Sequence, residues 1–199
     1  MNEPQEVRAR NLRTVGALAA LFLLPLALSF SIYYGTAWRP GGHVNHGTLI
    51  APPRPLPALA LPGAAPGQAE TAATFRGAWT LVYVGDGQCD EDCRQALLVM
   101  RQTRLALNND MARVARVWLV TGSCCAGEVA AAPEPGLIAL DATGARAGAL
   151  LEAFPTAARE HSLFVVDPLG NLMMRYDARA DPRGLLIDLQ KLLRLSHIG

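Results

Sequence analysis

Cys89 and Cys93 are separated by three residues and lie where an apolar strand is expected to give way to a helix. Residues four apart on a helix face the same side, so their two sulfur atoms can converge. Cys89 comes just before the helix, where unpaired backbone N–H groups and the positive helix end favour a thiolate. The pair can therefore close a disulfide, or bind Cu(I) or zinc through two soft thiolates.

A metal ion on two thiolates generally needs another ligand, and His161 is the candidate. It opens an expected strand over residues 163–166. In the fold that the order of the strands and helices predicts, the residues entering this strand lie beside the cysteine loop, and a neutral imidazole suits copper. The alternative is an exposed histidine at a strand edge.

Acidic side chains crowd the cysteine motif: Asp86, Asp90, Glu91 and Asp92. Their negative charge opposes thiolate formation but attracts a cation. The same residues also suit the first turn of a helix, where negative charge is favourable. The acidic cluster therefore agrees with a metal-binding role without requiring one.

Cys124 and Cys125 follow the second expected strand. The carboxyl ends of neighbouring parallel strands meet at one edge of a sheet, so these cysteines are expected on the same edge as Cys89. They could relay disulfide exchange, supply a further sulfur ligand or pair with each other. The alternative is that they are simply small residues leaving a strand.

The elements that would position these residues alternate along the chain. Strand, helix and strand come first, then a variable stretch, then a β-hairpin whose turn contains Pro168 and Gly170, and then a helix capped by Asp181 with Pro182 at its first position. The expected ranges are strands 79–84, 116–121, 137–140, 163–166 and 172–176, and helical segments 90–107, 149–154 and from 182 onward. This order predicts an α/β, thioredoxin-like fold.

A membrane segment precedes that domain. Residues 15–34 carry no charge, and twenty residues of helix rise about 30 Å, enough to cross the hydrocarbon core of a bilayer. Arg8, Arg10 and Arg13 precede the segment, whereas Arg39 alone follows closely. The positive-inside rule then keeps the N-terminus cytoplasmic and exports the remainder. A cleaved signal peptide is the less favoured alternative.

The expected organisation is a cytoplasmic N-terminus over residues 1–14, a transmembrane helix over 15–34, a linker over 35–73 and the domain over 74–199. The linker is rich in proline, alanine and glycine, which predicts an extended spacer without a core of its own. His43 and His46 lie in it, and we interpret them as part of a polar loop. We expect His197 to be exposed and without a role.

Composition excludes one class of partner. The net charge is +1, seventeen of the eighteen basic residues are arginines scattered along the chain, and no basic tract occurs. Nucleic acid is therefore not an expected partner.

The segment from Phe75 to Cys93 resembles the strand, loop and helix of the Sco/SenC family, and His161 to Gly170 resembles the family's histidine-containing strand and turn. Asn45-His46-Gly47, after the anchor, is similar to a motif of small transmembrane proteins linked to bacterial oxidase assembly. The resemblance implies a membrane-anchored thioredoxin-like protein of the inner membrane whose domain faces the periplasm.

It further implies that Cys89, Cys93 and His161 bind copper for delivery to the copper centre of cytochrome c oxidase, or that the cysteines reduce that centre. An oxidase subunit is then the expected partner. Two alternatives stay open: a thiol–disulfide oxidoreductase, with Cys89 as the more exposed nucleophile and Cys93 resolving, and a non-catalytic protein that holds an oxidase subunit.

Overall fold

The computed structural model describes residues 3–35, 45–64, 71–72, 75–124, 135–157, 159–196 and 198. Two compact units account for the chain, residues 1–43 and residues 44–199. In the first unit, α1 (Glu3–Gly35) contains the apolar segment, and Arg8–Gly35 is long and apolar enough to cross a membrane, with a mean hydropathy of 2.3. By length and composition this helix is a candidate membrane anchor.

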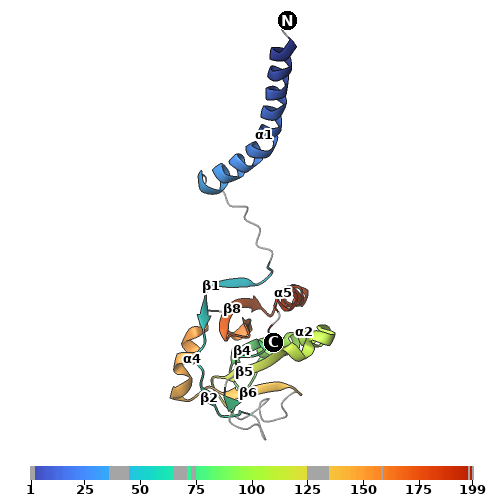
Figure 1. The fold of residues 1–199 in the computed structure, drawn as a ribbon. Coiled ribbons are helices and arrows are strands. Elements are labelled where there is room, and N and C mark those ends of the chain that lie inside the picture. Colours follow the sequence, from blue (N-terminus) through green and yellow to red (C-terminus); the bar gives the residue numbers. More distant parts are fainter. Residues whose placement is uncertain are drawn as a thin grey trace. The chain divides into compact units, whose positions relative to one another are not determined.

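The second unit is built on strands and short helices, coloured from cyan to red along the chain in Figure 1. The strands are β1 (Thr48–Pro55), β2 (Ala60–Leu61), β3 (Thr71–Ala72), β4 (Trp79–Gly85), β5 (Val114–Val120), β6 (Leu137–Asp141), β7 (Ser162–Val166) and β8 (Asn171–Asp177). The helices are α2 (Glu91–Ala106), η1 (Asn108–Arg113), η2 (Ala145–Ala147), α4 (Gly148–Ala153), η3 (Arg159–His161) and α5 (Pro182–Leu195).

Six strands form one sheet in the order β1-β8-β7-β4-β5-β6. Strands β4, β5 and β6 run parallel, whereas β7, β8 and β1 each pair antiparallel with their neighbour. The sequence β4-α2-β5, then α4-β7-β8-α5, is the thioredoxin-like arrangement. The fold class expected from the sequence is therefore confirmed.

The sheet has a core on each face because side chains alternate along a strand. Leu81 and Tyr83 of β4 belong to the core that contains α2 and α5, while Val82 and Val84 face the core that contains α4. β4 is buried along its whole length, as a central strand covered on both faces should be. The carboxyl end of β4 therefore stands on a rigid base, and the cysteine motif begins there.

The predicted linker is not a simple spacer between residues 48 and 64. β1 pairs with β8 at the edge of the sheet, and Leu56, Leu61 and Ala64 are buried. Prolines are tolerated in β1 because it is an edge strand, whose outward N–H groups need no partner in the sheet. Residues 48–64 are thus part of the folded domain, and the expected boundary at residue 74 lies too far along the chain.

A buried carboxylate fixes the start of this domain. Asp188 of α5 is buried and accepts hydrogen bonds from the backbone N–H of His46 at 2.8 Å and of Gly47 at 3.0 Å. Its other oxygen lies 3.1 Å from His46 Nδ1. Asp188 therefore joins the segment that follows the anchor to the last helix of the domain.

Substituting Asp188→Ala should lower the free energy of unfolding by about 3 kcal/mol, because two backbone N–H groups lose their acceptor. The matched control is His46→Ala, since that imidazole is 48% exposed and its contact with Asp188 should contribute less than about 1 kcal/mol. Urea unfolding of the chain from Asn45 onward measures both. Equal losses in the two variants would contradict the anchoring role of the carboxylate.

Candidate functional site

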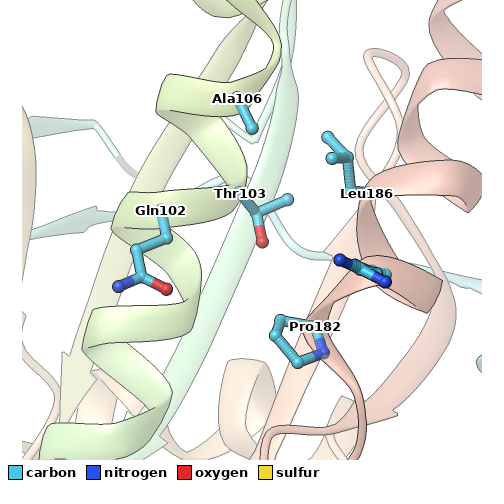
Figure 2. A pocket seen from close by; sticks show the side chains of 6 residues that line it. Gln102, Thr103, Ala106, Pro182 and Leu186 are labelled. Atoms are coloured by element: carbon cyan, nitrogen blue, oxygen red, sulfur yellow. The ribbon is translucent and has the colours of Figure 1, made fainter.

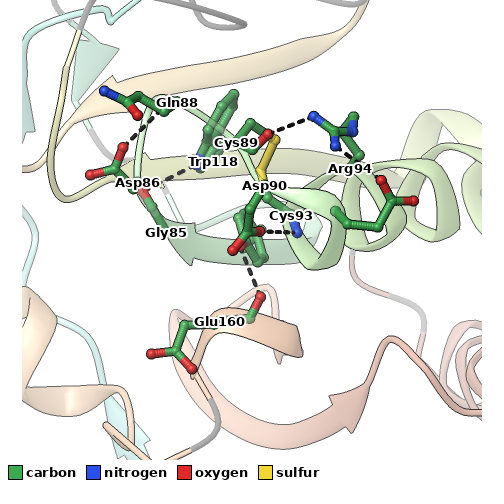
Figure 3. Close-up of a disulfide and its surroundings, with 11 residues drawn as sticks. Gly85, Asp86, Gln88, Cys89, Asp90, Cys93, Arg94, Trp118 and Glu160 are labelled. Carbon is green, nitrogen blue, oxygen red and sulfur yellow. Dashed lines mark hydrogen bonds and ion pairs between the residues drawn. A yellow bond between two sulfur atoms is a disulfide. The ribbon is translucent and has the colours of Figure 1, made fainter.

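Cys89 and Cys93 form a disulfide at the carboxyl end of β4 and the first turn of α2 (Figure 3). Their Cα atoms are 5.1 Å apart. One helical turn therefore brings the two sulfur atoms together, as the spacing indicates. In this state the sulfurs are bonded to each other and cannot act as thiolate ligands.

The loop that carries Cys89 is shaped by aspartates. Asp86 accepts a hydrogen bond from the backbone N–H of Gln88 at 2.8 Å, and its carbonyl accepts from the N–H of Cys89 at 3.3 Å. Asp90 is the N-cap of α2 and accepts from the N–H of Cys93 at 2.9 Å. These acids therefore define the turn and the helix start, which is the structural role that the sequence left as an alternative to cation attraction.

Both cysteines are buried, each 2% exposed. The expectation that Cys89 would be the more exposed of the two is therefore wrong. The two residues belong to the core that includes α2, α5 and Trp118 of β5. A partner sulfur can reach the pair only if a neighbouring segment moves.

One such segment follows β5 and lies directly against the cysteine loop. The N–H of Gly87 donates to the carbonyl of Gly122 at 2.8 Å. A Cβ at Gly87 would lie 2.5 Å from the carbonyl oxygen of Ser123, and one at Gly122 would lie 2.4 Å from the Asp86 carboxylate. Glycine at position 87 lets the cysteine loop approach the backbone at Ser123, and glycine at position 122 leaves room for the Asp86 carboxylate.

Cys124 ends the described part of this second loop. It is partly buried, packs against the core that contains Cys89 and Cys93, and is itself disulfide-bonded. Cys125 lies outside the described residues. The sequence-based expectation that Cys124 lies at the same sheet edge as Cys89 agrees with this placement.

A cation, Arg94, lies beside the motif. Its guanidinium donates to the carbonyl oxygen of Cys89 at 2.9 Å and forms an ion pair with Glu91 at 2.9 Å (Figure 3). Arg94 is not among the site residues expected from the sequence, although its position three residues after Glu91 is a signal for such a pair on a helix. Arg94 holds the backbone of Cys89 against the helix and places one positive charge among the acids.

The pKa of the Tyr83 phenol reflects this acidic environment. Tyr83 Oη donates to the carbonyl of Glu160 at 2.9 Å and so ties β4 to η3. Burial raises the pKa of Tyr83 well above its usual value near 10, and the negative charges of Asp90, Asp92 and Glu160 raise it further. The phenol therefore stays protonated and keeps its hydrogen bond at any physiological pH.

This pKa shift predicts a pH dependence. Tyr83→Phe should cost about 1 kcal/mol of stability at pH 8, through the lost hydrogen bond. Above pH 10 the phenol ionises in the unfolded chain but not in the folded one, so the native protein loses stability as pH rises. The variant lacks that loss, so the stability difference should shrink between pH 8 and pH 11 in urea unfolding. A constant difference would contradict the raised pKa.

His161 lies at the end of η3, which packs against both α2 and β4. Its carbonyl oxygen accepts from the N–H of Ala178 at 2.8 Å, so its backbone is fixed at the start of β7. Within the described part of the chain, no group of three histidine, cysteine or acidic side chains is placed to hold a metal ion. The disulfide form therefore does not gather Cys89, Cys93 and His161 into a copper site.

Besides His161, the described part of the chain contains one histidine, His46. The His46 imidazole is paired with Asp188, a role that the interpretation as a polar loop did not include. His43 and His197 lie outside the described residues.

Comparison with known protein families agrees with the thioredoxin-like fold of the structure. A family model described as a transmembrane-like, thioredoxin-like, C-terminal domain matches residues 79–196. No curated protein sequence matches the chain.

Several solved structures share the fold. Apo Sco1 from Thermus thermophilus is 21% identical with a TM-score of 0.55, and the match covers 76% of this chain and 99% of that one. Copper-bound ScoI from Bradyrhizobium japonicum is 16% identical with a TM-score of 0.53, covering 68% and 98%. Copper-bound yeast Sco1 is 13% identical with a TM-score of 0.56, covering 72% and 91%. At identities this low, the structural likeness shows that the fold is shared.

Proposed function

The chain belongs to the family of transmembrane-like, thioredoxin-like C-terminal domains, and we propose that it is a membrane-anchored assembly factor for cytochrome c oxidase. Its working part is the Cys89–Cys93 pair, which reduces the oxidase copper site or carries copper to it. The observation that carries the proposal is the disulfide between these cysteines at the first turn of α2. α1 spans the inner membrane, with the N-terminus cytoplasmic and the domain in the periplasm, where an oxidase subunit is the partner.

The redox step is a thiol–disulfide exchange. The thiolate of Cys89 attacks one sulfur of a client disulfide and expels the other client sulfur as a thiolate. The thiolate of Cys93 then attacks the Cys89 sulfur, closes the Cys89–Cys93 disulfide and releases the second client thiolate. Two electrons pass to the client, and the two protons of the cysteine pair end on the client thiols. A dithiol protein of the same compartment must then reduce the pair again.

Several contacts support this order of attack. Cys89 lies before the first turn of α2, so a thiolate there faces the positive end of the helix. The N–H of Cys93, by contrast, is already bonded to the cap Asp90. Arg94 adds a cation next to Cys89, which offsets part of the surrounding negative charge. Because both cysteines are buried, the exchange also requires the loop containing Gly122 to open away from the cysteine loop.

Copper is the cargo in the second half of the proposal. Once the pair is reduced, its two soft sulfurs suit Cu(I), and the fold matches copper-bound ScoI and Sco1 structures. His161 is the proposed third ligand because η3 lies against α2 and β4, the two elements that carry the cysteine loop. Loading therefore has to follow reduction of the disulfide and requires the imidazole to approach the sulfurs.

A copper titration separates the two halves of the proposal. The full chain in detergent, reduced with a phosphine, should bind one Cu(I) taken from a competing chelator. Cys89→Ser and Cys93→Ser should each lose that binding, and His161→Ala should weaken it about tenfold or more. His46→Ala is the matched control, because its imidazole belongs to the Asp188 contact and should leave binding unchanged.

Copper binding that survives both cysteine substitutions would contradict the cargo role. No copper binding together with turnover of a peptide disulfide would leave a thiol–disulfide oxidoreductase. Neither activity would leave a non-catalytic protein that holds an oxidase subunit through a static disulfide.

A further inference from the structure

The last helix, α5, has one side that the rest of the domain does not cover. Leu185, Leu189 and Leu193 are buried in the core. Figure 2 shows Pro182 and Leu186 on the side of α5 that faces α2. The remaining side is exposed, and its residues are three or four apart, so they form one stripe along the helix: Arg183, Ile187, Lys191 and Arg194.

The three cations of this stripe have no acidic partner among the described residues. Arg183, Lys191 and Arg194 take part in none of the ion pairs or side-chain hydrogen bonds that the structure contains there. The acids of α5 are used elsewhere, because Asp181 caps the helix and Asp188 is buried against the backbone at the start of the domain. The positive charge of the stripe therefore faces outward.

Apolar side chains are interleaved with these cations. Ile187 is 49% exposed, and Leu195 and Ile198, which follow the stripe, are 70% and 54% exposed. Cations beside exposed apolar groups on one helix face are typical of helices that lie on an anionic membrane surface. Long basic side chains suit this position because their stems cover apolar groups while their charged ends reach the lipid headgroups.

The chain enters the domain beside this helix. The backbone N–H groups of His46 and Gly47 are bonded to Asp188, the residue after Ile187. Asn45 follows the last residue of α1, Gly35, by ten residues, which can span at most about 36 Å. A tether this short keeps the local concentration of the domain at a bilayer high, so that weak attraction is enough for docking.

We infer that the exposed stripe of α5 docks the domain on the anionic headgroups of the bilayer that α1 spans. The three cations pair with lipid phosphates, and Ile187 and Leu195 contact the apolar boundary beneath them. This inference rests on the membrane anchor in the proposed function and is independent of the redox and copper roles of the cysteines.

The same electric field orients the cysteine motif. Asp86, Asp90 and Glu91 are exposed around Cys89, and an anionic surface repels them while it attracts α5. The docked domain therefore turns its cysteine edge away from the lipid, toward the space in which a partner protein is met.

Lys191 is the only lysine of the chain, so it is a natural probe for docking. The full chain is placed in lipid nanodiscs made either of phosphatidylcholine alone or of phosphatidylcholine and phosphatidylglycerol in equal parts. An uncharged acetylating reagent is added, and mass spectrometry follows acetylation of Lys191 over time. The reaction should be at least about fivefold slower in the anionic discs, and high salt should remove the difference.

A double variant tests whether the stripe causes this protection. Arg183→Gln combined with Arg194→Gln should bring the rate at Lys191 in anionic discs to within about twofold of the rate in neutral discs. Arg146→Gln is the matched control. It removes an exposed arginine beside the core on the other face of the sheet, so protection should be retained.

Equal rates in the two kinds of disc would overturn the inference and would leave the stripe to an acidic protein surface. Protection that persists in high salt, or in the double variant, would overturn it as well. Recovery of the chain with the discs tests the anchor separately. A chain that is retained by the discs but reacts freely at Lys191 contradicts docking alone, whereas a chain that is not retained contradicts the anchor and docking together.

Discussion

Replacing Cys89 by serine should abolish thiol–disulfide exchange by this chain while leaving its domain folded. Exchange needs a sulfur that attacks and a sulfur that resolves, and the pair that the structure joins is Cys89 and Cys93. The disulfide closes a loop with a sequence separation of 4, so its loss should cost only about 2 kcal/mol of unfolding free energy. Reduction of a disulfide-bonded peptide by the phosphine-reduced, desalted chain measures the effect.

The companion substitution identifies the attacking sulfur. Cys93→Ser should still attack the peptide through Cys89 but should stall as a mixed disulfide, visible by mass spectrometry. Cys89→Ser should form no mixed disulfide with the peptide at the Cys89–Cys93 site. Cys124→Ser is the control for the neighbouring cysteine and should retain turnover. The assigned roles are wrong if Cys89→Ser retains full turnover. They are also wrong if Cys93→Ser completes the reaction while Cys124→Ser does not.

Removing residues 45–74 should destabilise the domain by about 6 kcal/mol or more. This deletion takes β1 from the sheet edge beside β8 and removes Leu56 and Leu61, which are 5% and 2% exposed. Full burial of a leucine contributes about 1.5–3 kcal/mol, and the Asp188 hydrogen bonds are lost as well. A loss of this size is a large share of the stability of a typical domain.

The measurement is urea unfolding, followed by circular dichroism, of chains that begin at Asn45, Thr48 or Phe75. The chain from Thr48 keeps β1 but lacks the residues that bind Asp188, so it should resemble Asp188→Ala, with a loss of about 3 kcal/mol. Equal stability of the chains from Asn45 and Phe75 would show that residues 45–74 are a spacer after all.

Local signals explain what could be predicted from the sequence. Asp181 caps α5 with Pro182 following, and Gly170 takes a positive φ in the hairpin turn, as expected. Each of these features depends on a few adjacent residues. The same holds for the cysteine pair, because one helical turn is enough to bring the two sulfurs together.

What the sequence did not predict depends on contacts between distant residues. β1 is held by β8 at the opposite end of the domain sequence, and its prolines are typical of a spacer as well as of an edge strand. The cysteine loop is bonded through Gly87 to the loop at Gly122, which belongs to another strand connection. The contact of His46 with Asp188 likewise spans a separation of 142 residues.

A redox titration of the full chain shows whether Cys89 and Cys93 form a reversible dithiol–disulfide pair. The chain is equilibrated in mixtures of reduced and oxidised glutathione, its free thiols are alkylated, and it is digested with trypsin. Cleavage after Arg76 and Arg94 places Cys89 and Cys93 in one peptide and Cys124 in another. The peptide with Cys89 and Cys93 should change reversibly between unlabelled and doubly alkylated forms as the glutathione ratio varies. If that peptide keeps its disulfide in every mixture, or never forms it, the proposed redox role of Cys89 and Cys93 is wrong.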